Sequence, residues 1–156
     1  MGLYYEDHYV GMEIITPART VTEADIVAFS GLTGDFNPIH VDAEYAAKGH
    51  YGARVAQGLL GLALAGGFSA QTGTNRGTSV GFIGLDNWRF LKPIFIGDTI
   101  HLKITVDKMF PTSKPDRGVI YRKEQLINQN GEVCQEGIKI IMQKKRPVPA
   151  AEEETK

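Results

Sequence analysis

Hydrophobic and polar residues alternate along much of the second half of the chain. From Ile100 to Val106 every second residue is apolar and the residues between them are polar, which is the pattern of a strand with one buried face. Asn130-Gly131 separates two further apolar runs and is a strong hairpin signal. Comparable strand-like runs cover residues 78–90, 119–127 and 134–142, with a shorter one at 13–20. The pattern predicts an antiparallel sheet of about five strands.

The first half of the chain has the spacing of a helix instead. A capping-box-like start at Thr22 and Asp25 precedes apolar residues that are three positions apart, namely Ile26, Phe29 and Leu32. We therefore predict an amphipathic helix of about ten residues.

A second helix is predicted to begin at Gly58. The segment from Leu59 to Phe68 is apolar on every side, so we expect this helix to be buried all round. Its glycines lower the helix propensity by about 1 kcal/mol each relative to alanine, and close approach of another backbone would compensate for that loss. A sheet wrapped around the helix would supply such an approach, and the fold class is α+β.

The length of the chain indicates the number of domains, and its net charge bears on the class of partner. The chain has 156 residues, and 17 basic against 18 acidic residues give it a net charge of −1. This balance argues against nucleic acid or an anionic membrane as the partner. We expect residues 1–144 to form a single domain. Residues 145–156 combine two prolines with a basic-then-acidic run, which predicts a flexible tail.

The cysteine and histidine pattern predicts neither a disulfide nor a metal site. Cys134 is the only cysteine, so no disulfide or paired-thiol motif can form within the chain. His8, His50 and His101 have no metal-ligand spacing to one another or to Cys134. A single thiol is typical of a reducing compartment, and we expect a cytoplasmic location. The most apolar stretch, Leu59 to Ala70, is too short to cross a bilayer.

The candidate chemistry lies in one short segment. Asp35 and His40 are five residues apart across a turn that contains Asn37 and Pro38. Two titratable groups held near each other on a stiff loop suit acid–base work on a bound water. The alternative is structural, with Asp35 capping the turn and His40 a hydrogen-bonded loop histidine. The spacing alone favours that structural alternative.

Gly58 is a second candidate, because it begins the apolar helix. Backbone N–H groups at a helix start are unpaired and carry positive partial charge. Such a place can hold a carbonyl oxygen that becomes an enolate. The alternative is an ordinary helix start with glycine chosen for its conformation.

The segments around these candidates resemble the MaoC-like dehydratase family, the (R)-specific enoyl-CoA hydratases. The resemblance is carried by Gly34-Asp35-Phe36-Asn37-Pro38-Ile39-His40, by Val55-Ala56-Gln57-Gly58-Leu59-Leu60, and by Phe90-Leu91-Lys92-Pro93 and Gly97-Asp98-Thr99. It extends over nearly the whole chain up to about residue 144. The Asp-x-Asn-Pro-x-His core is specific, so the resemblance reverses the structural reading of Asp35 and His40.

The resemblance implies a hot-dog fold, in which an antiparallel sheet wraps around a long central helix, here residues 58–70. It implies reversible addition of water to a trans-2-enoyl thioester, with acyl-CoA as the substrate and no cofactor or metal. It also implies a homodimer or a larger homo-oligomer. Asp35 and His40 match the family's catalytic pair, Asn37 the residue that orders the loop, and Gly58 the position whose N–H holds the thioester oxygen.

One departure from the family pattern is Gln57, because the family commonly has histidine before this glycine. The backbone rather than that side chain would bind the oxyanion, so we expect function to survive. Two alternative functions stay open. One is a hot-dog thioesterase, which usually lacks the Asn-Pro-x-His turn found here. The other is a non-catalytic acyl-thioester binding subunit, which loss of Asp35 or His40 would have indicated.

Overall fold

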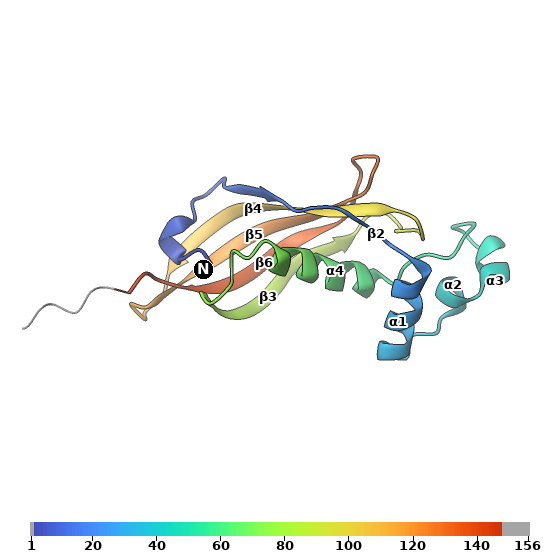
Figure 1. The fold of residues 1–156 in the computed structure, drawn as a ribbon, viewed down its shortest axis with the longest axis horizontal. Coiled ribbons are helices and arrows are strands. Elements are labelled where there is room, and N and C mark those ends of the chain that lie inside the picture. Colours follow the sequence, from blue (N-terminus) through green and yellow to red (C-terminus); the bar gives the residue numbers. More distant parts are fainter. Residues whose placement is uncertain (1, 148–156) are drawn as a thin grey trace, which may run out of the picture.

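Six antiparallel strands form one curved sheet in the computed structural model, which describes residues 2–147 (Figure 1). The strands are β1 (Glu13–Ile15), β2 (Arg19–Thr20), β3 (Ser79–Phe90), β4 (Thr99–Pro111), β5 (Arg117–Ile127) and β6 (Val133–Lys144). The helices are the short 3-10 turn η1 (Tyr5–Asp7), α1 (Glu23–Thr33), α2 (Pro38–Val41), α3 (Ala43–Ala47) and α4 (Gly58–Gln71). The sheet order is β1-β4-β5-β6-β3, and β2 also pairs with β4.

The number of strands differs by one from the prediction. The run at residues 13–20 is two short strands, because it is interrupted at Pro17, which has no N–H to donate to a neighbouring strand. Both short strands pair with β4: β1 pairs with residues 103–105, and β2 pairs with residues 99–100. The hairpin predicted at Asn130-Gly131 is confirmed, and Gly131 has a φ of +76° there.

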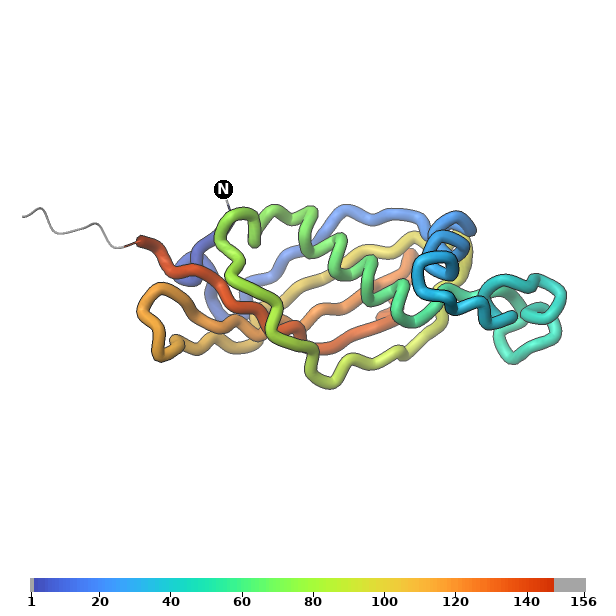
Figure 2. The backbone as a smooth tube through the Cα atoms, turned by 90° about the horizontal axis from the view of Figure 1, so that it is seen from below, coloured from blue at the N-terminus to red at the C-terminus, as the bar shows by residue number. Residues whose placement is uncertain are grey.

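Helix α4 lies across the concave face of the sheet (Figures 1 and 2). The alternating residues of β4 face this helix, and Ile100, Leu102 and Ile104 are fully buried. They pack with Ala65 and Phe68 of α4 in the main hydrophobic core. The predicted sheet around a central helix is confirmed.

The prediction that this helix is buried all round is wrong. The side chain of Leu59 is 61% exposed, and Ala63, Gly67 and Ala70 are also exposed. The sheet of one chain covers only one side of α4. Because the helix is apolar on every side, its other side is apolar and uncovered.

Helix α1 begins at the predicted capping box and has 11 residues, against about ten predicted. The Asp25 carboxylate accepts a hydrogen bond of 2.8 Å from the N–H of Thr22, which is the N-cap. Gly34 ends the helix in the left-handed region, with φ +78°. The predicted apolar face is wrong at Leu32, which is 82% exposed. The helix projects beyond the end of the sheet together with α2 and α3, so little of it meets the core (Figure 1).

The N-terminal segment and the end of β6 lie together at the opposite end of the sheet. The N–H of Arg146 donates to Glu6 Oε2 at 3.0 Å, and the Arg146 guanidinium pairs with Asp7. Residues 148–156 of the predicted tail lie outside the described residues. None of the helices between residues 2 and 147 has the length and apolar content needed to span a bilayer.

Candidate active site

The Asp35–His40 segment is a tight turn followed by one turn of helix. Asp35 Oδ1 accepts from the N–H of Asn37 at 3.3 Å, and Asn37 Oδ1 accepts from the N–H of Ile39 at 3.4 Å. Asn37 is thereby the N-cap of α2, with Pro38 at its first position. The expectation of a turn throughout residues 35–40 is wrong from Pro38 onward, because proline is well suited to the first position of a helix.

His40 is anchored to the strand-like segment that precedes α4. Its Nδ1 lies 2.7 Å from the carbonyl oxygen of Val55, and the N–H of Val55 donates to the carbonyl of Ile39 at 3.2 Å. A carbonyl oxygen only accepts, so Nδ1 must carry a proton. In the neutral ring the lone pair is then on Nε2. The backbone of Val55, bonded to the His40 ring and to the carbonyl of Ile39, therefore fixes both the position and the tautomer of His40.

Nε2 of His40 faces the Asp35 carboxylate. The Nε2–Oδ2 distance is 3.8 Å, and the two side chains are 9% and 45% exposed. This separation is too long for a direct hydrogen bond and is one that a water molecule can bridge. The structure thus brings together the acid and the base that the sequence singled out, with the imidazole buried and the carboxylate open to solvent.

Gly58 begins α4, as predicted, directly after Gln57 as the N-cap. The N–H of Gly58 is in the first turn and has no helical acceptor, and among residues 2–147 it donates to no other group. The Phe90 ring lies against its Cα, because an added Cβ would be 3.0 Å from the ring carbons Cδ1 and Cε1. Glycine at this position therefore lets Phe90 cover the helix start.

His40 and Gly58 line the same cleft, which has a volume of about 530 Å³. Phe90 and Ile94 are among its apolar lining residues, and Gln135 also borders it. Asp35 faces Nε2 of His40 but is not among the residues that line the cleft, and Asn37 holds the loop as the N-cap of α2. Of the four residues predicted for the site, His40 and Gly58 therefore line the cleft, whereas Asp35 and Asn37 do not.

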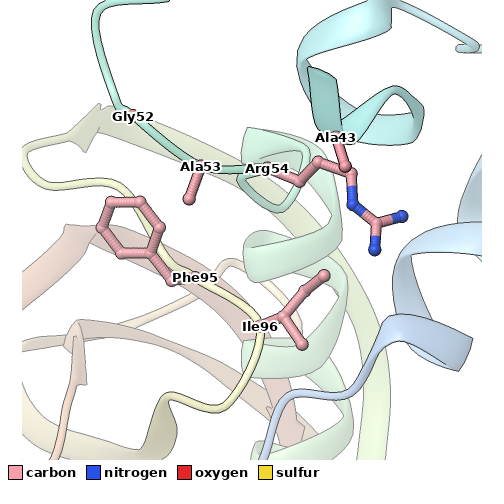
Figure 3. Close-up of a pocket in the computed structure, with 6 residues that line it drawn as sticks. All are labelled: Ala43, Gly52, Ala53, Arg54, Phe95 and Ile96. Carbon is pink, nitrogen blue, oxygen red and sulfur yellow. The ribbon is translucent and has the colours of Figure 1, made fainter. Parts of the chain in front are cut away.

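A separate hollow of about 300 Å³ is lined by residues 52–54 of the loop that precedes Val55 (Figure 3). Phe95 and Ile96 form its apolar part and Arg54 borders it. The guanidinium of Arg54 is paired with Glu23 Oε1 of α1 at 2.6 Å. This hollow has no carboxylate–histidine pair among its lining residues.

Gln57 points away from the cleft. Its Nε2 donates to Ser30 Oγ at 2.8 Å and to the carbonyl of Ile26 at 3.4 Å, and the residue is 2% exposed. The side chain therefore ties α1 to the start of α4 and leaves the neighbouring N–H groups to face the cleft.

Two contributors to the site were missed at the level of sequence. The Val55 carbonyl is a backbone group, so no side-chain pattern identifies it. Gln135 lies 77 residues after Gly58, whose carbonyl accepts from its Nε2 at 3.0 Å. Only the pairing of β6 with the rest of the sheet brings it to the cleft.

The sequence matches a known domain family. The family model described as MaoC like domain matches residues 7–125. The 3-hydroxybutyryl-CoA dehydratase of Methylorubrum extorquens is 35% identical over 116 residues, which are 74% of this chain and 71% of that protein. Protein MaoC of Klebsiella aerogenes is 37% identical over 102 residues, and there the match covers 65% of this chain and 30% of the relative.

Solved structures give the same result for the fold. A monoamine oxidase regulatory protein from Archaeoglobus fulgius is similar with a TM-score of 0.87 and 35% identity, covering 94% of this chain and 97% of that one. A Mycobacterium tuberculosis protein described as having a double hotdog fold is similar with a TM-score of 0.78 at 18% identity, covering 96% and 46%. The sheet and its central helix therefore form a hot-dog fold.

Proposed function

Because the chain belongs to the MaoC-like dehydratase family, we propose that it is an (R)-specific enoyl-CoA hydratase that adds water reversibly to trans-2-enoyl-CoA. The supporting observation is the shared cleft of His40 and Gly58, with Asp35 beside the imidazole. A base and a backbone oxyanion donor on one cleft are the two groups that this addition needs. The reaction uses water and the thioester alone and requires no metal or organic cofactor.

The first step is addition of water at the β-carbon. The thioester carbonyl withdraws electrons and makes the β-carbon electrophilic. Nε2 of His40 carries the lone pair and takes one proton from the water, whose other O–H is held by the Asp35 carboxylate. The water oxygen forms a bond to the β-carbon, and the electron pair of the carbon–carbon double bond moves toward the carbonyl oxygen.

The second step returns a proton to the α-carbon. Negative charge accumulates on the carbonyl oxygen, where the N–H of Gly58 and the positive end of α4 stabilise the enolate. The enolate collapses and its α-carbon takes a proton from the Asp35–His40 pair. The product is 3-hydroxyacyl-CoA, and the reverse sequence removes water.

The experiment that tests the proposal follows crotonyl-CoA by the absorbance of its conjugated thioester and by release of free thiol. Loss of absorbance without free thiol is the expected result. Thiol release would identify a thioesterase instead. An unchanged substrate at high protein concentration would contradict the hydratase proposal for short chains and favour a binding subunit.

A further inference from the structure

Trp88 and Gln135 form a hydrogen-bonded pair beside the first turn of α4. Trp88 Nε1 donates to Gln135 Oε1 at 3.2 Å, and Gln135 Nε2 donates to the carbonyl of Gly58 at 3.0 Å. Gln135 is only 3% exposed. Because both ends of its amide are engaged, the side chain is fixed in one direction and its polar atoms are satisfied.

The pair fits because the two residues it packs against, Gly61 and Gly137, have no side chain. A Cβ on Gly61 would collide with the amide of Gln135, and a Cβ on Gly137 would lie 2.7 Å from Cε3 of Trp88. Any larger residue at either position would displace the pair. The glycine inside α4 is therefore explained by the close approach of Gln135 rather than by helix propensity.

Two cavities lie beside α4, one at its first residue and one further along the helix. The cleft of about 530 Å³ is lined by Gly58 and Gln135, and a second cavity of about 290 Å³ is lined by Leu62 and Gly66. Gln135 lies on Gly61, between these two sets of helix residues. Gly58 and Leu62 are separated by only about 6 Å of helix at about 1.5 Å per residue.

The second cavity has mainly apolar walls. Phe82 and Leu85 of β3 line it together with Leu62. Its charged residues, Glu124 and Lys139, are paired with each other at 3.9 Å. The methylene groups of a hydrocarbon chain would suit such walls.

We propose that Gln135, held by Trp88, is the end wall of the acyl cleft and restricts the substrate to short acyl chains. The inference rests on the proposed function, which places the thioester carbonyl at the start of α4. An acyl chain that leaves this point passes the apolar residues Phe90 and Ile94 and meets the Gln135 amide. Removing the wall would join the cleft to the second cavity.

The test measures binding of saturated butyryl-, octanoyl- and dodecanoyl-CoA by calorimetry, which needs no turnover. In the wild type we expect affinity to stop rising between butyryl- and octanoyl-CoA. In Gln135→Ala the ratio of octanoyl- to butyryl-CoA affinity should increase about tenfold or more, since one methylene admitted to an apolar pocket is worth about tenfold at least. The ratio cancels a general loss of binding in the variant.

Gln135→Met is the matched control, because it keeps the length of the side chain and loses its hydrogen bonds. It should keep the wild-type ratio of octanoyl- to butyryl-CoA affinity. An increase in this ratio equal to that of Gln135→Ala would contradict the proposal that Gln135 is the end wall. Affinity that keeps rising with chain length in the wild type would overturn it as well, even if Gln135→Ala does not fold.

The outcomes separate this inference from the hydratase proposal. A gain of long-chain binding in Gln135→Ala, with no hydration of crotonyl-CoA by the wild type, would support the wall and contradict the hydratase. An unchanged ratio with hydration intact would overturn the wall alone. A wild type that binds none of the three acyl-CoA probes would overturn both.

Discussion

The direction of one imidazole ring decides what the Asp35–His40 pair can do. Nδ1–H of His40 donates a hydrogen bond to the Val55 carbonyl, which leaves Nε2 free to accept a proton on the side of Asp35. The other tautomer, with the proton on Nε2, would present a proton instead of a lone pair to the water. The backbone of Val55 therefore sets the role of a side chain fifteen residues earlier.

This geometry predicts the effect of removing either partner. Asp35→Asn and His40→Ala should each lower kcat by about 10²–10⁴, the range of a general acid–base group. The double variant should be little worse than the worse single variant, because the two groups act as a unit. Initial rates with crotonyl-CoA measure the effect.

A histidine outside the cleft supplies the control for that experiment. His101→Ala on β4 should leave the rate near that of the wild type, since His101 touches neither the cleft nor the pair. Turnover at the wild-type rate in either Asp35→Asn or His40→Ala would contradict the assignment of this pair as the catalytic acid and base.

The oxyanion assignment can be tested at Gly58, although its donor is a backbone group. Gly58→Pro removes the N–H, and proline is accepted in the first turn of a helix. Gln57, with φ −59° and ψ 139°, already has the backbone conformation required before proline. We expect a folded protein with kcat reduced by about 10²–10³.

Gly58→Ala is the paired control, because it keeps the donor. Its Cβ would be 3.0 Å from the Phe90 ring, which is 55% exposed and can move aside. A modest loss there beside a large loss in Gly58→Pro would assign the effect to the N–H. If the folded proline variant turns over at the wild-type rate, the donor is another group, such as the N–H of Leu59.

The parts of the site that could be predicted are those that lie in local sequence. Asp35, Asn37 and His40 belong to one seven-residue segment, and Gly58 precedes an apolar run. The partners that orient them, Val55 and Gln135, act across the fold. No local spacing reveals them, because strand pairing and loop closure bring them to the cleft.

Among the elements, α1 has a start that can be tested by pH. Burial alone would raise the pKa of Asp25, but hydrogen bonds from Thr22 and Arg19 outweigh it and hold that pKa below the usual 3.8. The stabilisation is therefore present above pH 3.8 and is lost as the pH falls through the lower folded value.

Asp25→Ala should lower the melting temperature by about 2–4 °C at pH 7, which corresponds to about 1 kcal/mol for a lost cap. The difference from the wild type should shrink as the pH is lowered below 3.8, and calorimetric scans at both pH values measure it. Asp107→Ala, which removes an exposed carboxylate that caps no helix, is the control. A difference that is the same at acid and neutral pH would contradict the role of the ionised cap.

The error over α4 shows what an apolar sequence cannot specify. Leu59–Phe68 has no polar side, which indicates that every side is to be covered but does not identify what covers it. The sheet of the same chain covers one side only. The other side, with Leu59 at 61% exposure, is consistent with cover from outside the chain.

At the scale of the whole molecule, β3 forms an edge of the sheet. It pairs with β6 on one side and, within residues 2–147, with no strand on the other. Phe82 and Ile83 of this strand are 60% and 51% exposed. A long apolar edge is a template for pairing with another chain, and two copies related by a two-fold axis can pair the same strand antiparallel.

We therefore expect a homodimer joined through β3, and light scattering at micromolar concentration should give twice the mass of the chain. Ile83→Lys places a charge in the proposed interface and should give a folded monomer, checked by circular dichroism. Ile15→Lys is the matched control, because Ile15 is 64% exposed on β1 at the opposite edge, and this variant should stay dimeric. A monomeric wild type would contradict the dimer. Dissociation by Ile15→Lys rather than by Ile83→Lys would move the interface to the other edge.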